Sequence, residues 1–154
     1  DSRRVVSLRL MPPASILPTA ISVGFLRQLR QLQEIRHAHL GRVEEVGLHN
    51  GVFFVASKWI RGKNLVRFIK KNRAARVGDA LGIGVQMLSA LKAMHAAGRV
   101  HGYLHPRNVY LRMTEKHSGV KLADAGVELT WRRHQVGGCL LPSEEPGNPS
   151  FLAP

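Results

Sequence analysis

Two short polar motifs at a fixed separation constrain the fold of this chain more than any other feature. The first is the octapeptide 101–108 (HGYLHPRN), and the second is Asp124-Ala125-Gly126, which begins 16 residues after Asn108. Apolar residues at 109–111 and 120–122 lie between the motifs and predict a β-hairpin. A long amphipathic segment that ends at Gly98 precedes the first motif. The pattern therefore predicts a helix, a polar loop, a hairpin and a second polar loop, in that order.

The residues upstream of Ile60 predict a small sheet with one helix packed on it. Strands are predicted at 4–10, 43–46 and 52–60, and the first should end before the breaker residues Met11-Pro12-Pro13. The tripeptide 49–51 (His-Asn-Gly) supplies the turn chemistry for a hairpin between the second and third strands. The apolar residues Phe25, Leu29, Leu32 and Ile35 recur at helical spacing. A helix in this region should therefore bury one stripe against the sheet.

Two further helices are predicted between the sheet and the first polar motif. Asn64 can cap a short helix that contains Leu65, Phe68 and Ile69, and a longer helix should span about 77–95. The expected buried face of the longer helix carries Leu81, Val85, Leu88, Leu91 and Met94. From Asp124 onward the chain is rich in Gly and Pro, which predicts a loop.

The two motifs together resemble the catalytic loop and metal-binding motif of protein kinases. His101, Leu104 and Asn108 match the H-R-D-L-x-x-x-N pattern at its spacing, and Asp124 stands at the first position of D-F-G. Residues 147–154 (GNPSFLAP) resemble the segment that leads into the A-P-E motif of the family. The chain is thus similar to a bacterial-type serine/threonine protein-kinase-like domain.

The resemblance extends upstream and implies an α+β, two-lobed fold that is truncated at both ends. Residues 6–9 (VSLR) resemble V-A-I-K, with Arg9 at the lysine, and the helix 25–39 places Gln28 at the conserved glutamate. Ser57 falls at the gatekeeper position, and Lys58, Trp59 and Ile60 fall at the hinge. Residues 1–60 would then form part of the N-lobe, and residues 61–154 the C-lobe through the activation segment.

The position of the catalytic aspartate is occupied by Tyr103. In a kinase this aspartate accepts the proton of the substrate hydroxyl, and a phenol, which keeps its proton at neutral pH, cannot replace that acceptor. His105 lies two residues further on and is a weak candidate for a substitute base. Alternatively, His105 is an ordinary, partly exposed loop histidine.

The resemblance also assigns nucleotide contacts and metal ligands. Arg9 keeps a positive charge for the phosphates, but Gln28 lacks the charge that would orient it, and arginine is not a conservative replacement for lysine here. Asn108 and Asp124 stand where the family holds Mg²⁺, although both residue types also cap loops. Tyr110 would lie beneath an adenine, or would be an ordinary strand tyrosine.

Two further departures concern the activation machinery that the resemblance implies. Ala125 replaces the phenylalanine of D-F-G, which should remove apolar burial and loosen the switch between active and inactive loop positions. Gly102 replaces an arginine that in many kinases pairs with a phosphorylated activation loop, so activation by that route is not expected.

These departures predict a pseudokinase with a regulatory or scaffolding role, protein partners, and weak or absent binding of ATP and Mg²⁺. A divergent active serine/threonine kinase is the first alternative. A basic nucleic-acid-binding module is the second, because the formal net charge is +13, but the Lys and Arg residues are spread along the chain and few aromatic residues are available for stacking. The single cysteine, Cys139, and the lack of a long apolar run predict a cytoplasmic domain without a membrane segment in this piece.

Overall fold

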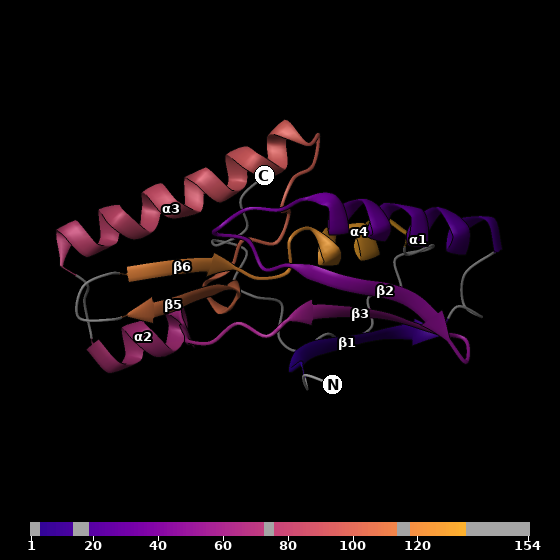
Figure 1. Cartoon of the computed structure of the whole chain (residues 1–154), viewed down its shortest axis with the longest axis horizontal. Helices are drawn as coiled ribbons and strands as arrows, with labels where there is room; N and C mark the ends of the chain where they lie inside the picture. The colour runs from indigo at the N-terminus through magenta and orange to yellow at the C-terminus, as the bar shows by residue number, and fades with distance from the viewer. Residues whose placement is uncertain (1–3, 14–18, 73–75, 114–117, 135–154) are drawn as a thin grey trace.

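The chain forms two three-stranded sheets, each with helices packed against it (Figure 1). The computed structural model describes residues 4–13, 19–72, 76–113 and 118–134. The first sheet contains β1 (Val6–Pro13), β2 (Val43–His49) and β3 (Val52–Lys58), and it is covered by α1 (Thr19–Glu34). The second contains β4 (Lys63–Asn64), β5 (Val109–Met113) and β6 (Ser118–Leu122), accompanied by α2 (Leu65–Asn72) and α3 (Val77–Ala96). A 3₁₀ turn (Pro106–Asn108) precedes β5, and α4 (Val127–His134) follows β6.

The hairpin of β2 and β3 forms where the turn residues predict it. Asn50 and Gly51 have φ angles of 48° and 77°, the left-handed conformation that both central residues of a tight hairpin turn require. β3 is the central strand of the sheet order β1-β3-β2, and all its pairings are antiparallel. It ends at Lys58, two residues before the predicted end, so Trp59 and Ile60 belong to the connection toward the second sheet.

The prediction that the first strand ends before Met11 is wrong. β1 continues through Pro13, which pairs with Val52 after a register shift beyond Leu10. A proline is tolerated here because β1 lies at the edge of the sheet as described, and an edge strand has one side without ladder partners. The extension brings Met11 into the core.

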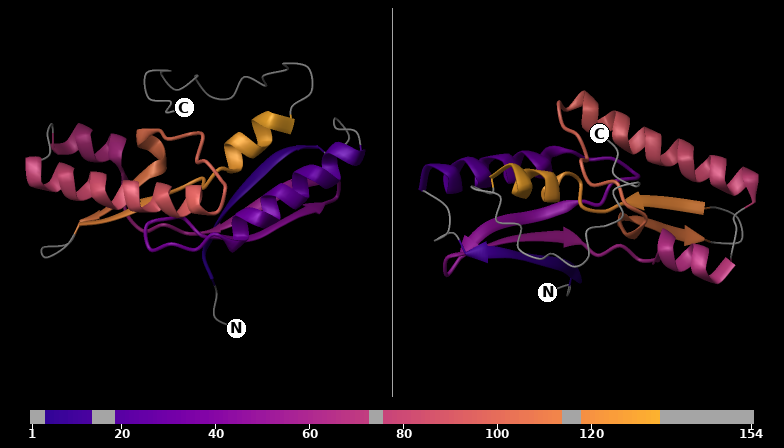
Figure 2. Two further views of the ribbon diagram at one scale, coloured as in Figure 1. Left: turned by 90° about the horizontal axis from the view of Figure 1, so that it is seen from above. Right: turned by 180° about the vertical axis from the view of Figure 1, so that it is seen from behind.

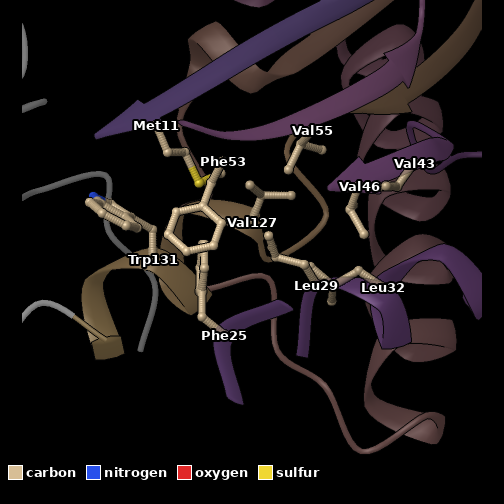
Figure 3. Close-up of a cluster of buried hydrophobic side chains, with 10 residues drawn as sticks. All are labelled: Met11, Phe25, Leu29, Leu32, Val43, Val46, Phe53, Val55, Val127 and Trp131. Carbon is tan, nitrogen blue, oxygen red and sulfur yellow. The ribbon is translucent and has the colours of Figure 1, made fainter. Parts of the chain in front are cut away.

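Helix α1 packs on the sheet through the predicted apolar stripe. Phe25 and Leu29 are fully buried, and the ring of Phe25 meets that of Phe53 edge-on at a centroid distance of 5.0 Å (Figure 3). The helix begins at Thr19 and ends at Glu34, so the prediction of helix up to His39 is wrong at its C-terminal end. Beyond the helix, the ring Nδ1 of His37 accepts a hydrogen bond from the backbone N–H of His39, which stabilises a turn in place of another helical turn.

The second sheet confirms the two local predictions made for it. β5 and β6 form the antiparallel hairpin that joins the two polar motifs. The side-chain oxygen of Asn64 accepts a hydrogen bond from the backbone N–H of Arg67 at 3.0 Å, which caps α2 as expected. α3 and α2 lie on opposite sides of this sheet in Figure 1.

The predicted buried face of α3 is correct at Met94, which is fully buried, and at Leu91, which packs against the core, but it is wrong for the other three residues. Leu81, Val85 and Leu88 are about two-thirds exposed, with relative exposures of 65%, 66% and 66%. Beside Met94, the helix buries Ile83 and Ala90, which were not predicted, against the second sheet. The exposed and the buried residues both follow helical spacing, because α3 is apolar around most of its circumference, and periodicity alone does not choose between them.

Helix α4 lies in a region that the sequence predicted to be a loop. It runs alongside α1 (Figure 2) and adds Val127 and Trp131 to the core of the first sheet. The Trp131 ring meets Phe25 edge-on at a centroid distance of 5.4 Å (Figure 3). Amphipathic packing therefore overrides the breaker-rich composition of this region. Residues 135–154, which include Cys139 and the predicted kinase-like segment 147–154, lie outside the described residues.

Trp131 should be a major contributor to stability, in contrast to the second tryptophan. Trp131→Ala is expected to lower the free energy of unfolding by about 3–5 kcal/mol, because it leaves a cavity against Phe25. Trp59→Ala is the matched control, since Trp59 is 55% exposed, and it should change stability by less than about 0.5 kcal/mol. Urea unfolding followed by circular dichroism measures both, and equal losses would contradict the placement of α4 in the core.

Candidate functional site

A cleft opens where the two sheets meet. It is bounded by β1, β3, the connection after β3, the start of β5 and the loop that joins β6 to α4, and its volume is about 170 Å³. The lining includes eight residues that the sequence assigned to nucleotide or metal binding: Arg9, Ser57, Lys58, Trp59, Ile60, Asn108, Tyr110 and Asp124. Residues more than one hundred positions apart thus converge on one concave surface.

Three of the predicted site residues do not line this cleft. Gln28 lies on α1, and Tyr103 and His105 lie on the loop before the 3₁₀ turn. The ion pairs of Arg9 are made with carboxylates of the segment after β6.

Asp124 has the most constrained carboxylate of the cleft. Its side chain is 2% exposed, and Oδ1 accepts hydrogen bonds from Nη1 of Arg9 at 2.9 Å and from the backbone N–H of Glu128 at 3.2 Å. The other oxygen, Oδ2, is buried without a hydrogen-bond partner among the described residues. Burial raises the pKa of Asp124 above its usual range, although the charge of Arg9 acts in the opposite direction.

The backbone at this position is held in an uncommon conformation. Asp124 and Ala125 have φ angles of 76° and 32°, and Gly126 follows with 85°. Left-handed angles at two consecutive residues with side chains are rare and persist only where the surroundings enforce them. The enforcing contacts here include the ion pair of Asp124 and the packing of the following helix.

His101, in the first polar motif, forms a hydrogen bond next to the second motif. It is 2% exposed, and its Nε2 donates a hydrogen bond to the carbonyl oxygen of Ala123 at 2.8 Å. Burial lowers the pKa of His101, against the opposing charge of Asp124, so the neutral ring is favoured. A neutral donor suits this role because it satisfies a carbonyl without placing a second buried charge beside the carboxylate.

A chain of ion pairs connects the cleft to helix α4. Arg9 Nη1 lies 3.4 Å from Oε2 of Glu128, and Nε of Arg132 donates to Oε1 of the same carboxylate at 2.7 Å. In protein kinases the strand cation pairs with a helix glutamate, but that position is occupied here by Gln28, which carries no charge. Arg9 pairs with Glu128 of α4 in its place. Glu128 is not among the site residues predicted from the sequence, although the i, i+4 spacing of Glu128 and Arg132 is itself a helix signal that could have pointed to it.

The loop 101–108 is shaped by its own contacts. The side-chain N–H of Asn108 donates to the carbonyl oxygen of Tyr103 at 3.0 Å, and Nδ1 of His105 accepts from the backbone N–H of Arg107 at 3.1 Å. The Tyr103 ring stacks on His105 at a centroid distance of 6.3 Å, and the guanidinium of Arg132 lies 5.0 Å from the centroid of the same tyrosine ring. The phenol ring is therefore in contact with a histidine of its own loop and with a cation from α4.

Gly102 makes room for helix α4. Its φ angle is 66°, and a Cβ atom placed on it would lie 2.5 Å from the Leu129 side chain. An arginine at this position would be strained by the backbone angle, and its Cβ would force Leu129 and α4 to shift from their observed place. The absence of the arginine and the docking of α4 are thus structurally linked.

The oxygen donors of the cleft fit a hard divalent cation in type. Mg²⁺ takes oxygen ligands and is commonly bound through one or two protein groups together with substrate phosphates. The unpartnered Oδ2 of Asp124 and the side-chain oxygen of Asn108 are such donors, whereas Arg9 already occupies Oδ1. Among the described residues no group of three or more His, Cys, Asp or Glu side chains could hold a metal ion by itself.

The chain belongs to the protein kinase family. The family model for protein tyrosine and serine/threonine kinases matches residues 18–140. Serine/threonine-protein kinase PkaA of Streptomyces coelicolor is 27% identical over 97% of this chain and 27% of its own length. Mouse serine/threonine-protein kinase ULK3 is 29% identical over 82% of this chain and 26% of its own length. A probable cell division protein kinase of Encephalitozoon cuniculi is 30% identical over 80% of this chain and 39% of its own length.

Solved kinase structures show the same fold. The kinase domain of Mycobacterium tuberculosis PknI superposes with a TM-score of 0.65 at 25% identity, over 79% of this chain and 49% of that one. Rad53 1–466 in complex with AMP-PNP superposes with a TM-score of 0.68 at 21% identity, over 79% of this chain and 31% of that one. The chain thus spans about half of the PknI domain, and the expected α+β, bacterial-type protein-kinase-like fold is confirmed. No helix within the described residues is long and apolar enough to cross a membrane.

Glu128 should anchor α4 to the cleft. Glu128→Gln removes the ion pairs with Arg9 and Arg132 and a favourable negative charge from the first turn of the helix, and it should lower the free energy of unfolding by about 0.5–1.5 kcal/mol. Glu45→Gln, on the exposed face of β2, is the matched control and should be neutral. Urea unfolding at low ionic strength gives the comparison, and an equal effect of the two variants would show that Glu128 is merely another surface charge.

Proposed function

We propose that this domain is a pseudokinase that acts through protein partners and does not transfer phosphate. One observation carries the proposal: helix α4 docks onto the positions at which the family's catalytic features are replaced. Arg9 pairs with Asp124 and Glu128, and Gly102 accepts Leu129. The replaced residues therefore stabilise one another in a single packed arrangement. Such an arrangement is expected of a domain that functions by binding partners through its surface.

The chemistry at Tyr103 supports the same proposal. Phosphoryl transfer to a hydroxyl needs an acceptor placed beside the attacking oxygen, and a protonated phenol donates where an acceptor is required. The ring is also stacked on His105 and covered by Arg132, so a substrate hydroxyl would have to displace these contacts to reach it. We infer that Tyr103 blocks the position of the missing carboxylate as well as failing to replace it.

His105 is a poor substitute base in this geometry. Its Nδ1 lone pair accepts the backbone N–H of Arg107, so the proton of the neutral ring lies on Nε2. A general base needs a free lone pair within hydrogen-bond reach of the proton it removes. His105 would have to break its hydrogen bond with the backbone N–H of Arg107 before it could act as a general base.

ATP and Mg²⁺ are proposed as weak ligands of the cleft. Asn108 and Asp124 would hold the metal ion, which when bound would neutralise charge on the nucleotide phosphates. Lys58, Trp59 and Ile60 would border the base, with Tyr110 beneath it. The Arg9 to Asp124 ion pair competes with the metal for the carboxylate, and the volume of about 170 Å³ is below the roughly 300 Å³ at which ligand sites usually begin.

A divergent active kinase is the second candidate, and the retained pair of Asn108 and Asp124 favours it. We also propose that the protein has protein partners, a regulatory or scaffolding role and a cytoplasmic location. Direct assays of nucleotide binding and turnover separate the two candidates.

The full-length protein should show no Mg²⁺-dependent ATP turnover above background, and binding of ATP should be weak and strengthened by Mg²⁺. Calorimetry and phosphate release measure the two quantities. Tyr103→Asp restores the acceptor. A gain in turnover over the parent would show that Tyr103 is the main cause of inactivity, and turnover at background would show that the other replacements also prevent catalysis.

Turnover in the parent that disappears in Asp124→Ala would contradict the pseudokinase proposal. His105→Ala would then show whether the histidine supplies the base. Lys70→Ala, an exposed position on α2, serves as the control because it lies outside the cleft and should change neither binding nor turnover.

A further inference from the structure

A second hollow lies next to the end of β3, where Lys58 borders both it and the cleft. It is formed by the turn after α1, the residue before β2, the end of β3 and the middle of β6, and its volume is about 340 Å³. Four of its lining side chains are cations, namely Arg36, Arg42, Lys58 and Lys121, and none of its lining residues is acidic. The volume is within the range of small-molecule sites.

Backbone hydrogen bonds bring these cations together. The N–H of Lys58 donates to the carbonyl oxygen of Arg42 at 2.8 Å, which joins the end of β3 to the start of β2. The N–H of Leu122 donates to the carbonyl oxygen of His39 at 2.8 Å, which places β6 against the turn after α1. The cations thus come from separate segments that are fixed to one another by the main chain.

Lys121 is the best positioned of the four. Its Nζ donates to the carbonyl oxygen of Leu40 at 3.2 Å, which holds the ammonium at the wall of the hollow. Burial, followed by the charge of Lys58, lowers the pKa of Lys121. Lys58 and Lys121 therefore repel one another. Arg42 has a carboxylate neighbour in Glu44 at 3.4 Å, which offsets only part of the excess positive charge of the hollow.

The wall beside Arg36 is also ordered. His37 accepts the backbone N–H of His39 at Nδ1, and its Nε2 lies 3.2 Å from the Ser89 hydroxyl on α3. The accepted N–H places the ring proton of the neutral histidine on Nε2, so the imidazole is oriented by both of its nitrogens. The hollow thus has a shaped wall, in contrast to a loose group of surface charges.

We propose that this hollow binds a small molecule that carries a phosphate group with at least two negative charges. A multiply charged phosphate can engage cations that approach from several directions, and the arginine forks and lysine ammoniums match its oxygens. Its charge would relieve the repulsion among the lining cations. The site is separate from the nucleotide cleft, although Lys58 borders both, and it would exist whether or not the domain is catalytically active.

Inorganic pyrophosphate without Mg²⁺ is the probe, titrated into the full-length protein by isothermal calorimetry at low and at moderate ionic strength. We expect saturable binding of one pyrophosphate, weakened by roughly fivefold or more in Lys121→Met and in Arg36→Gln. Arg36 is exposed, so its replacement tests the site without endangering the fold.

Two control variants locate the binding. Lys70→Met removes an exposed lysine from α2, and Arg9→Met removes the cation of the nucleotide cleft; neither should change the affinity by more than about twofold. Absence of saturable binding would overturn the proposal. An equal loss in Lys70→Met would assign the binding to diffuse positive charge, and a loss confined to Arg9→Met would assign it to the cleft; both results would also overturn it.

Discussion

The ion pair between Arg9 and the buried carboxylate of Asp124 is the interaction on which the arrangement of the cleft depends. Burial raises the pKa of Asp124 and so disfavours the charged form, and Arg9, at 2.9 Å, is the nearest compensating charge. The same carboxylate oxygen accepts the N–H of Glu128 and thereby fixes the first turn of α4. One side chain therefore connects the edge strand of the first sheet, the end of the β5 to β6 hairpin and the helix that follows it. The second carboxylate oxygen, buried without a partner among the described residues, gives this position its potential as a metal ligand.

The docking of α4 explains why the departures from the kinase pattern occur together. With Gln28 in place of a glutamate, the strand cation takes its second partner from Glu128, and the missing side chain of Gly102 leaves space for Leu129. Replacement of the D-F-G phenylalanine by Ala125 should have loosened this region, but Trp131 supplies aromatic burial next to Phe25. Apolar burial of this size outweighs exposed ion pairs in energy, so packing holds α4 in place and the charges set its register.

Local signals in the sequence predicted the features that depend on near neighbours. The Asn50-Gly51 turn and the Asn64 cap were correct because each is decided by residues within four positions. The eight cleft residues were found through the kinase resemblance and not through periodicity. Long-range contacts decided the rest: α3 is apolar around most of its circumference, and only its packing against the second sheet selects Ile83 and Ala90 over Leu81, Val85 and Leu88. The partnership of Arg9 and Glu128 spans 119 positions, so no local pattern could reveal it.

A double-mutant cycle between Arg9 and Asp124 tests the central claim most directly. The free energy of unfolding is measured for the parent, Arg9→Met, Asp124→Asn and the double variant. The account predicts that Arg9→Met destabilises the parent, because it leaves a buried carboxylate without its cation, and that the loss shrinks by about 1 kcal/mol or more when Asp124→Asn is already present. Additive effects of the two substitutions would contradict the account, since they would show that the strand cation and the buried carboxylate do not stabilise one another.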